Sequence, residues 1–119
     1  MIEIGLKHTS ELTVTDTVTA IKMGSGDMPV LATPAMMALM ENAAMLAVDD
    51  ELPEGCTTVG GHIQSSHLKP SKIGDKVSAT AEVTRTAVVT ASILCNLTVG
   101  RIVIAIASVM TSAIVHIRI

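Results

Sequence analysis

The chain has 119 residues, which is enough for one compact domain and too few for two of ordinary size. Hydrophobic residues make up 49% of it, charged residues 16%, and the mean hydropathy is +0.56, so a disordered chain is excluded. A net charge of −3 and the absence of Phe, Tyr and Trp argue against a nucleic-acid-binding protein, which needs a basic face and often stacks bases on aromatic rings. We therefore expect a single domain over residues 1–119 with an aliphatic and methionine-rich core.

Several sequence features bear on where the protein resides. The N-terminal segment contains Glu3 and no apolar stretch of the kind found in secretory signals. Cys56 and Cys95 do not have the spacing of a redox or metal motif, so both are expected to be reduced thiols. The longest apolar stretch, residues 102–115, is shorter than the roughly 18 residues of a membrane-spanning helix. We expect a cytoplasmic protein that does not insert into membranes.

The first part of the chain predicts one strand and one loop. Threonine and valine are frequent in residues 6–16, and β-branched residues favour a strand. Two glycines lie within residues 23–27, and glycine disfavours both helix and strand. A flexible loop is therefore expected between this strand and the next element.

A long helix is expected to begin at Thr33 and Pro34. The Thr33 hydroxyl can cap exposed N–H groups, and proline is favoured in the first helical turn. The helix is expected to end within residues 49–52. Only Glu41 and Asn42 are polar in its body, so we expect it to be buried on nearly every side.

Branched residues return after the helix and predict four strands. These strands are expected at residues 57–68, 75–86, 88–99 and 102–119. Four successive strands favour an antiparallel meander, and such a sheet can curl around the apolar helix and cover it. The order of one strand, one helix and four strands is that of the hotdog fold, an α+β architecture. The helix surface left at the open side of the sheet predicts a homodimer, with further assembly into a tetramer left open.

Glu41 is the most informative single residue. Keeping a carboxylate charged in apolar surroundings without partners costs several kcal/mol, and folding does not require one at this position. We therefore favour a general base or a nucleophile. The structural alternative is that Glu41 faces a dimer cleft or solvent, bonded with Asn42 across a two-fold axis. Asn42 itself is expected to be a partner or a packing residue rather than a reactive group.

His67 is the second candidate. With a period of two, it shares one face of its strand with Ile63 and Ser65, while His62 lies on the other face. A lone histidine in a strand is more often structural than catalytic, and this remains the interpretation for His62, His8 and His116. No group of histidine, cysteine and acidic residues has metal-ligand spacing, so no metal site is expected.

Two glycines and three lysines flank this histidine. Gly60 and Gly61 indicate either a bulge that lets the sheet bend or backbone N–H groups that hold a developing negative charge. Lys69, Lys72 and Lys76 follow closely. Such a cluster is either solvated surface or a contact for the phosphates of an anionic substrate.

Three stretches, taken in order, carry a family resemblance: LATPAMMALMENAAMLAV, TTVGGHIQSSHLKP and IGDKVSATAEV. Together they resemble the hotdog-fold acyl-CoA thioesterases of the fluoroacetyl-CoA thioesterase-like group, over residues 6–84. In that family a Thr before the long helix, a Glu within it and a His on the next strand form the active site. The matching residues here are Thr33, Glu41 and His67, with Gly60 at the family's oxyanion position.

The resemblance implies hydrolysis of a small or medium acyl-CoA thioester by a homodimer. Glu41 is expected to activate water or to attack the carbonyl carbon itself, and His67 to transfer protons or stabilise the thiolate leaving group. The N–H groups of Gly60 and Gly61 are expected to hold the oxyanion. No metal or organic cofactor is needed, because a thioester is already an activated acyl group.

Thr33, Asn42 and Lys69 complete the expected site as contacts for water or substrate. A continuous helix separates Thr33 from Glu41 by about 12 Å along its axis, because they are eight positions apart and each position adds about 1.5 Å. Both side chains therefore cannot contact one thioester carbon. Either the first helical turn is irregular, or the site lies at a dimer interface and draws on both chains.

Two other functions compete with hydrolysis. An enoyl-CoA hydratase with the same fold needs an Asp and a His across a double bond, and the helix contains no Asp before Asp49, which disfavours it. A non-catalytic acyl-CoA-binding or scaffold protein is the second alternative. It is favoured by residues 87–119, where Arg101 and Arg118 are the only Lys, Arg, Asp or Glu residues.

Overall fold

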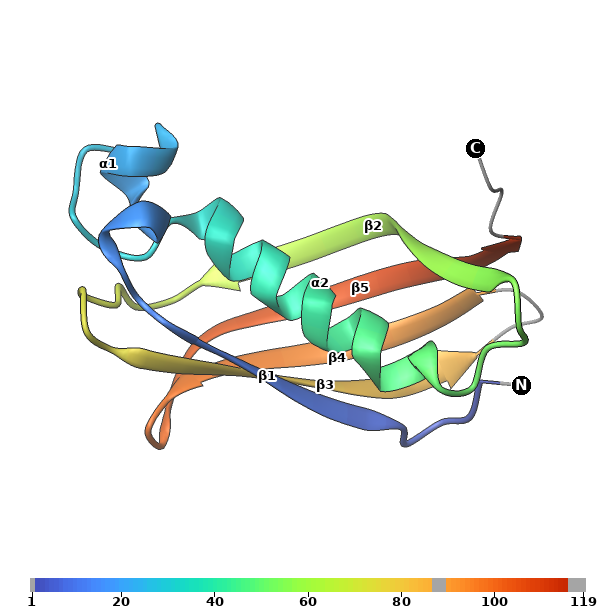
Figure 1. Cartoon of the computed structure of the whole chain (residues 1–119). Helices are drawn as coiled ribbons and strands as arrows, with labels where there is room; N and C mark the ends of the chain where they lie inside the picture. Colours follow the sequence, from blue (N-terminus) through green and yellow to red (C-terminus); the bar gives the residue numbers. More distant parts are fainter. Residues whose placement is uncertain (1, 87–89, 116–119) are drawn as a thin grey trace.

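The computed structural model describes residues 2–86 and 90–115 and shows one antiparallel sheet curled around one long helix (Figure 1). The elements in chain order are β1 (Lys7–Thr13), the 3-10 helix η1 (Asp16–Val18), α1 (Ala20–Met23), α2 (Thr33–Asp49), β2 (Cys56–His67), β3 (Lys76–Thr86), β4 (Thr90–Val99) and β5 (Ile102–Val115). The predicted α+β arrangement is confirmed. No helix of the described part is long and apolar enough to cross a membrane.

The strand order in the sheet is β1-β3-β4-β5-β2. β3, β4 and β5 form the expected meander, but β2 pairs with β5 rather than with β3. The predicted meander of four strands is therefore wrong at its first step. The connection from β2 to β3 is too long for a tight hairpin, and it is held beside the start of α2, where Leu31 N–H donates to the Ser71 carbonyl at 2.8 Å. β1 and β2 are left as the two edge strands.

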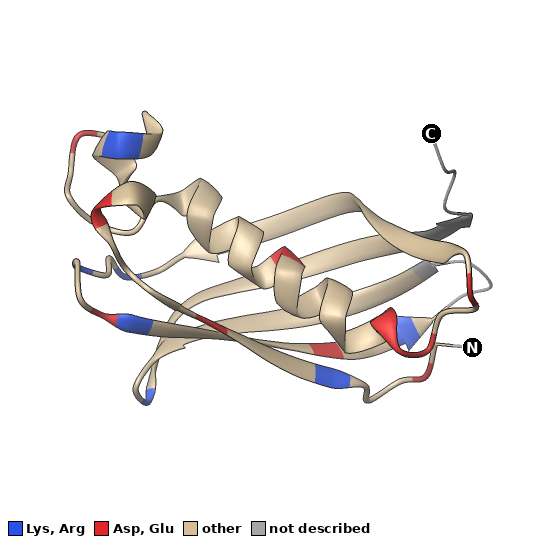
Figure 2. Cartoon of the chain, viewed as in Figure 1, with Lys and Arg blue, Asp and Glu red and all other residues tan. Residues whose placement is uncertain are grey.

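Helix α2 is buried on one side only. Its small and flexible residues pack against the sheet, and the fully or nearly buried ones are Ala35, Met36, Met40, Ala43, Ala44, Ala47 and Val48. The opposite side, with Glu41, Asn42, Met45 and Leu46, is exposed in the single chain, and Glu41 is the one acidic residue in the body of the helix (Figure 2). The expectation of burial on nearly every side is wrong, because a five-stranded sheet reaches around only part of the helix.

A β-bulge in β2 decides which of its residues face α2. Gly60 pairs with Thr111, whereas the next paired residue is His62, so Gly61 is the extra residue. Gly60 and His67 are seven positions apart and would lie on opposite faces of a regular strand. The extra residue corrects this difference, so both residues face the helix. Of the two interpretations of the glycine pair, the bulge is confirmed.

The segment between β1 and α2 contains a short helix that the sequence did not indicate. The Thr19 hydroxyl accepts a hydrogen bond from Lys22 N–H at the start of α1, and Gly24 ends it in the left-handed conformation, with φ of 74°. Four residues are too few to show a helical hydrophobic period. The loop predicted at residues 23–27 therefore begins only where α1 ends, at Gly24.

Candidate active site

Thr33 is bonded to His67 and does not cap α2. Ala32 occupies the N-cap position, and no side chain caps this helix end. The Thr33 Oγ1 atom instead lies 3.0 Å from His67 Nδ1, where either group can be the donor. The expected capping role of Thr33 is therefore wrong, because the helix begins one residue earlier in the chain than a Thr33 cap requires. The hydroxyl is free to orient the imidazole ring.

The other ring nitrogen of His67 points into a protected space. Its Nε2 atom is shielded from water and has no hydrogen-bond partner in the part of the chain that the structure describes. Thr33, His67 and Lys69 line one hollow of about 350 Å³, together with residues of α1 and of the loop before α2. The half-buried imidazole thus has one nitrogen fixed and one nitrogen available for proton transfer.

Glu41 lies against Gly60 on the neighbouring strand. A Cβ atom added to Gly60 would be only 2.7 Å from Glu41 Oε2, so the absence of a side chain lets the carboxylate approach the backbone of β2. Glu41 and Gly60 line two adjoining hollows, of about 310 and 430 Å³. Gly61 lines the second of these. The carboxylate is exposed in the single chain and opens onto both hollows.

Asn42, next to Glu41 on the exposed side of the helix, is anchored to β1. Ser10 of β1 donates a hydrogen bond to Asn42 Oδ1 at 2.7 Å. Asn42 also lines the hollow of about 310 Å³ beside Glu41. Ser10 was not singled out by sequence because its pairing with Asn42 joins residues far apart in the chain.

The two pairs, Thr33 with His67 and Glu41 with Gly60, remain apart within one chain. Helix α2 is continuous from Thr33, which excludes the irregular first turn considered above. Thr33 and Glu41 are thus about 12 Å apart along the axis, and Gly60 and His67 are roughly 20 Å apart along β2. One chain places the carboxylate and the imidazole too far apart to act on a single atom.

A comparison of the chain with protein families gives one match. A sequence profile of the fluoroacetyl-CoA-specific thioesterase family matches residues 14–115. The chain belongs to this family. The predicted resemblance is confirmed, but the match begins at residue 14 rather than residue 6 and extends to the last residue of β5 rather than ending near residue 84. A search of curated protein sequences found no match.

Solved structures establish the hotdog fold of this family member. A variant of the fluoroacetyl-CoA-specific thioesterase is similar with a TM-score of 0.87 at 22% identity, covering 96% of this chain and 89% of that one. A Thermus thermophilus thioesterase superfamily member gives 0.89 at 21% identity, covering 97% and 85%. A hot-dog-like protein from Thermanaerovibrio acidaminovorans gives 0.85 at 20% identity, covering 94% and 83%.

Other polar residues of this thioesterase family member lie beside the two pairs or farther away. His62 is exposed on the face of β2 opposite to His67, as predicted, but it also lines the hollow of about 430 Å³ beside Glu41 and Gly60. Lys76 forms an ion pair with Glu11 at 2.8 Å, and this hydrogen-bonded carboxylate raises the pKa of Lys76. Of the three clustered lysines, Lys69 is the one that lines the hollow of His67. His116 lies outside the described residues.

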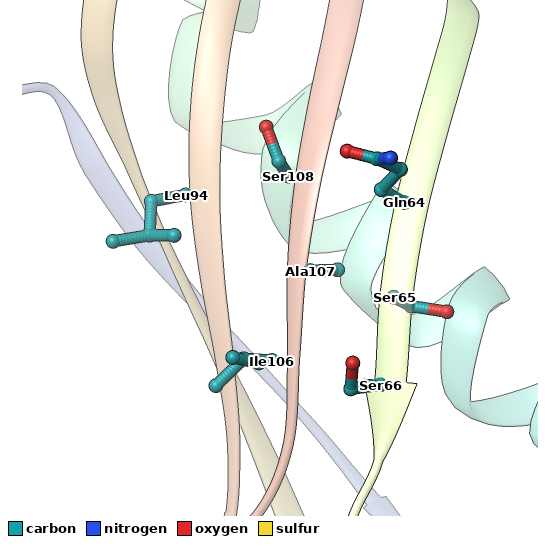
Figure 3. A pocket seen from close by; sticks show the side chains of 7 residues that line it. All are labelled: Gln64, Ser65, Ser66, Leu94, Ile106, Ala107 and Ser108. Carbon is teal, nitrogen blue, oxygen red and sulfur yellow. The ribbon is translucent and has the colours of Figure 1, made fainter.

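The buried thiol of Cys95 and a hollow on the outer face of the sheet are not candidates for the active site. Cys95 is buried, and desolvation raises the pKa of its thiol to about 11, so it is a poor nucleophile. Figure 3 shows a hollow on the face of the sheet turned away from α2, lined by side chains that include Gln64, Leu94 and Ile106. Its serines have no acidic, basic, histidine or cysteine residue beside them in the lining, so this outer hollow offers no general base to activate a hydroxyl.

Proposed function

We propose that the protein hydrolyses a small or medium acyl-CoA thioester to the free acid and coenzyme A, at a site completed by a second copy of the chain. Membership of a thioesterase family supports the general chemistry. The observation that carries the rest is the separation of the functional side chains into two pairs at different points of β2. Each pair is half of a catalytic site.

The free edge of β2 is where the second copy would bind. β2 is an edge strand of 12 residues, and an unpaired edge of this length readily pairs with another strand. Antiparallel pairing of β2 with the same strand of a partner, about a two-fold axis near its middle, reverses the strand direction. The Gly60 end of one strand then lies beside the His67 end of the other. Two equivalent composite sites result, and the exposed sides of both α2 helices face each other.

In each composite site, Glu41 of one protomer would act with His67 of the other. Glu41 activates a water molecule or attacks the carbonyl carbon directly, and the Gly60 N–H holds the oxyanion. His67 Nε2 protonates or stabilises the departing thiolate, while Thr33 holds Nδ1 and so fixes the ring. The carbonyl–sulfur bond breaks, and water supplies the oxygen of the free acid.

The remaining predicted residues would bind the substrate. Lys69, in the hollow of His67, is placed to contact phosphates of coenzyme A. Asn42 lines one hollow beside Glu41 and would contact the acyl end through its side chain, whereas Gly61 lines the other hollow and would contact it only through its backbone N–H. The free thiols of Cys56 and Cys95 fit a reducing, cytoplasmic setting.

The first experiment measures thiol release from a panel of acyl-CoA thioesters with a thiol-reactive dye. Glu41→Gln and His67→Ala should each lower kcat by about 10² or more, because each removes a group that moves a proton. His8→Ala is the control, since it removes a histidine of β1 that lines none of the hollows of Glu41 and His67, and it should retain activity. Tight binding of acyl-CoA without thiol release would favour the non-catalytic alternative.

The second experiment mixes the two inactive variants after unfolding and refolding them together. In a mixed dimer, one composite site carries both substitutions and the other carries neither. Random pairing therefore restores about a quarter of the wild-type activity. A site contained within one chain would carry a substitution in every copy, and the mixture would stay inactive.

A further inference from the structure

The cavity beside Glu41 lies under the part of the sheet that α2 leaves uncovered. The helix packs mainly against β1 and β3 and touches β2 and β5 less. The space that remains is a cavity of about 310 Å³ between α2 and these two strands. Its lining, besides Glu41 and Asn42, consists of Ala38, Met45, Thr58, Gly60, Val109 and Thr111. A volume of this size suits a short acyl group.

Thr111 is the unusual residue in this lining. It is 5% exposed, and its Oγ1 has no hydrogen-bond partner in the described part of the chain. The other inward-facing residues of β5 before it, Ala105, Ala107 and Val109, are apolar. A buried hydroxyl without a partner is unfavourable, and valine would fill the same space. Folding therefore does not account for a hydroxyl at this position.

The position of Thr111 relative to Glu41 defines what the hydroxyl can reach. Thr111 is the direct cross-strand partner of Gly60, and the Glu41 carboxylate lies over Gly60. Opposed residues of antiparallel strands have Cα atoms about 4.5–5.5 Å apart. In an acyl group, an oxygen on C3 accepts or donates a hydrogen bond to an atom about 5–6 Å from the carbonyl carbon. A carbonyl carbon held by Glu41 over Gly60 would therefore have Thr111 as a neighbour on the side where an oxygen substituent on C3 can extend.

We propose that Thr111 is a specificity-determining residue that recognises a neutral oxygen, hydroxyl or keto, on C3 of a short acyl-CoA. This inference rests on the proposed thioester hydrolysis at Glu41. A charged acyl group such as a carboxylate is disfavoured, because Glu41 lines the same cavity and repels it. Rotation about the Cα–Cβ bond of Thr111 exchanges its methyl and hydroxyl groups, which brings the hydroxyl to the ligand.

The test compares kcat/KM for 3-hydroxybutanoyl-CoA, acetoacetyl-CoA and butanoyl-CoA. The wild type should prefer at least one oxygenated substrate over butanoyl-CoA by about tenfold or more. Thr111→Val, which keeps the shape and removes the hydroxyl, should bring that ratio close to one, and Thr111→Ser should keep it. Ser71→Ala is the control, because Ser71 is also a buried hydroxyl without a partner among the described residues but does not line this cavity.

The outcomes separate the two proposals. Hydrolysis of all three substrates without a preference in the wild type, or a preference that survives in Thr111→Val, overturns the role of Thr111 and leaves thioester hydrolysis standing. Hydrolysis of none of a broad acyl-CoA panel overturns the proposed function, and the inference with it. If Thr111→Val fails to fold, the other two proteins still test the role of Thr111. Absence of a preference in the wild type, or loss of the preference in Thr111→Ser, overturns it.

Discussion

Replacing Gly60 by alanine tests whether the position of the Glu41 carboxylate matters for catalysis. The new Cβ would lie 2.7 Å from Glu41 Oε2, whereas ordinary contact begins at 3.4 Å. The carboxylate must therefore withdraw by about 0.7 Å or more. Since a displacement of about 1 Å at a reacting group can cost on the order of 10² in rate, we expect kcat to fall by about 10- to 100-fold.

The same substitution should not destabilise the fold. Gly60 does not have a positive φ, so alanine can adopt its backbone conformation. Alanine also reduces the conformational entropy of the unfolded chain, which stabilises by about 0.4–1 kcal/mol at compatible positions. The atom it meets is the end of a flexible side chain that can rotate away. The Tm should stay the same or rise by a few degrees while activity falls.

Gly61→Ala is the matched control in this experiment. Its added Cβ would meet only the Met110 carbonyl oxygen at 3.8 Å, an ordinary contact that leaves Glu41 in place. Alanine keeps the backbone N–H, so this variant should retain most of the activity. Thiol release gives kcat for both variants, and thermal unfolding gives Tm. Wild-type kcat in a folded Gly60→Ala protein would refute the proposed contact between this carboxylate and the reacting carbon.

The other predictions concern the imidazole, the thiols and the assembly. Thr33→Val should lower kcat by about tenfold by releasing His67 Nδ1, and Thr33→Ser should restore it; equal rates for both variants would contradict the orienting role. At pH 8 a thiol reagent should label Cys56 and spare the buried Cys95 until denaturant is added. Stability should fall as pH rises from 9.0 towards about 11, because the unfolded Cys95 thiol ionises first. Sedimentation should give twice the protomer mass of 12.3 kDa, and a monomer would rule out the composite site.

Local sequence signals predicted the elements better than their partners. Proline and alanine-rich sequence placed α2 correctly, and alternation placed His67 and His62 on opposite faces of β2. The pairing of β2 with β5 depends on contacts between distant segments, which no local pattern records. The burial of α2 also depends on such contacts. Its apolar composition predicted burial on nearly every side, but the sheet leaves one side of the helix exposed.

The sequence indicated candidate site residues but not their geometry. Thr33, Glu41 and His67 followed from a family resemblance, but their division into two pairs required the structure. The Thr33 hydroxyl resembled a helix cap because threonine before proline is a common start signal. Thr111 was missed, although a polar residue at an inward position of an otherwise apolar strand is a signal that alternation alone can reveal.

The bulge in β2 makes the protein sensitive to single-residue insertions and deletions there. Deleting Gly61 would restore strict alternation, and either Gly60 or His67 would then turn to the outer face of the sheet. Inserting one more residue beside it would have the same effect, whereas inserting two would preserve the parity of the strand. Proposed catalysis therefore requires that the number of residues between Gly60 and His67 keep its parity, just as it requires the side chains themselves.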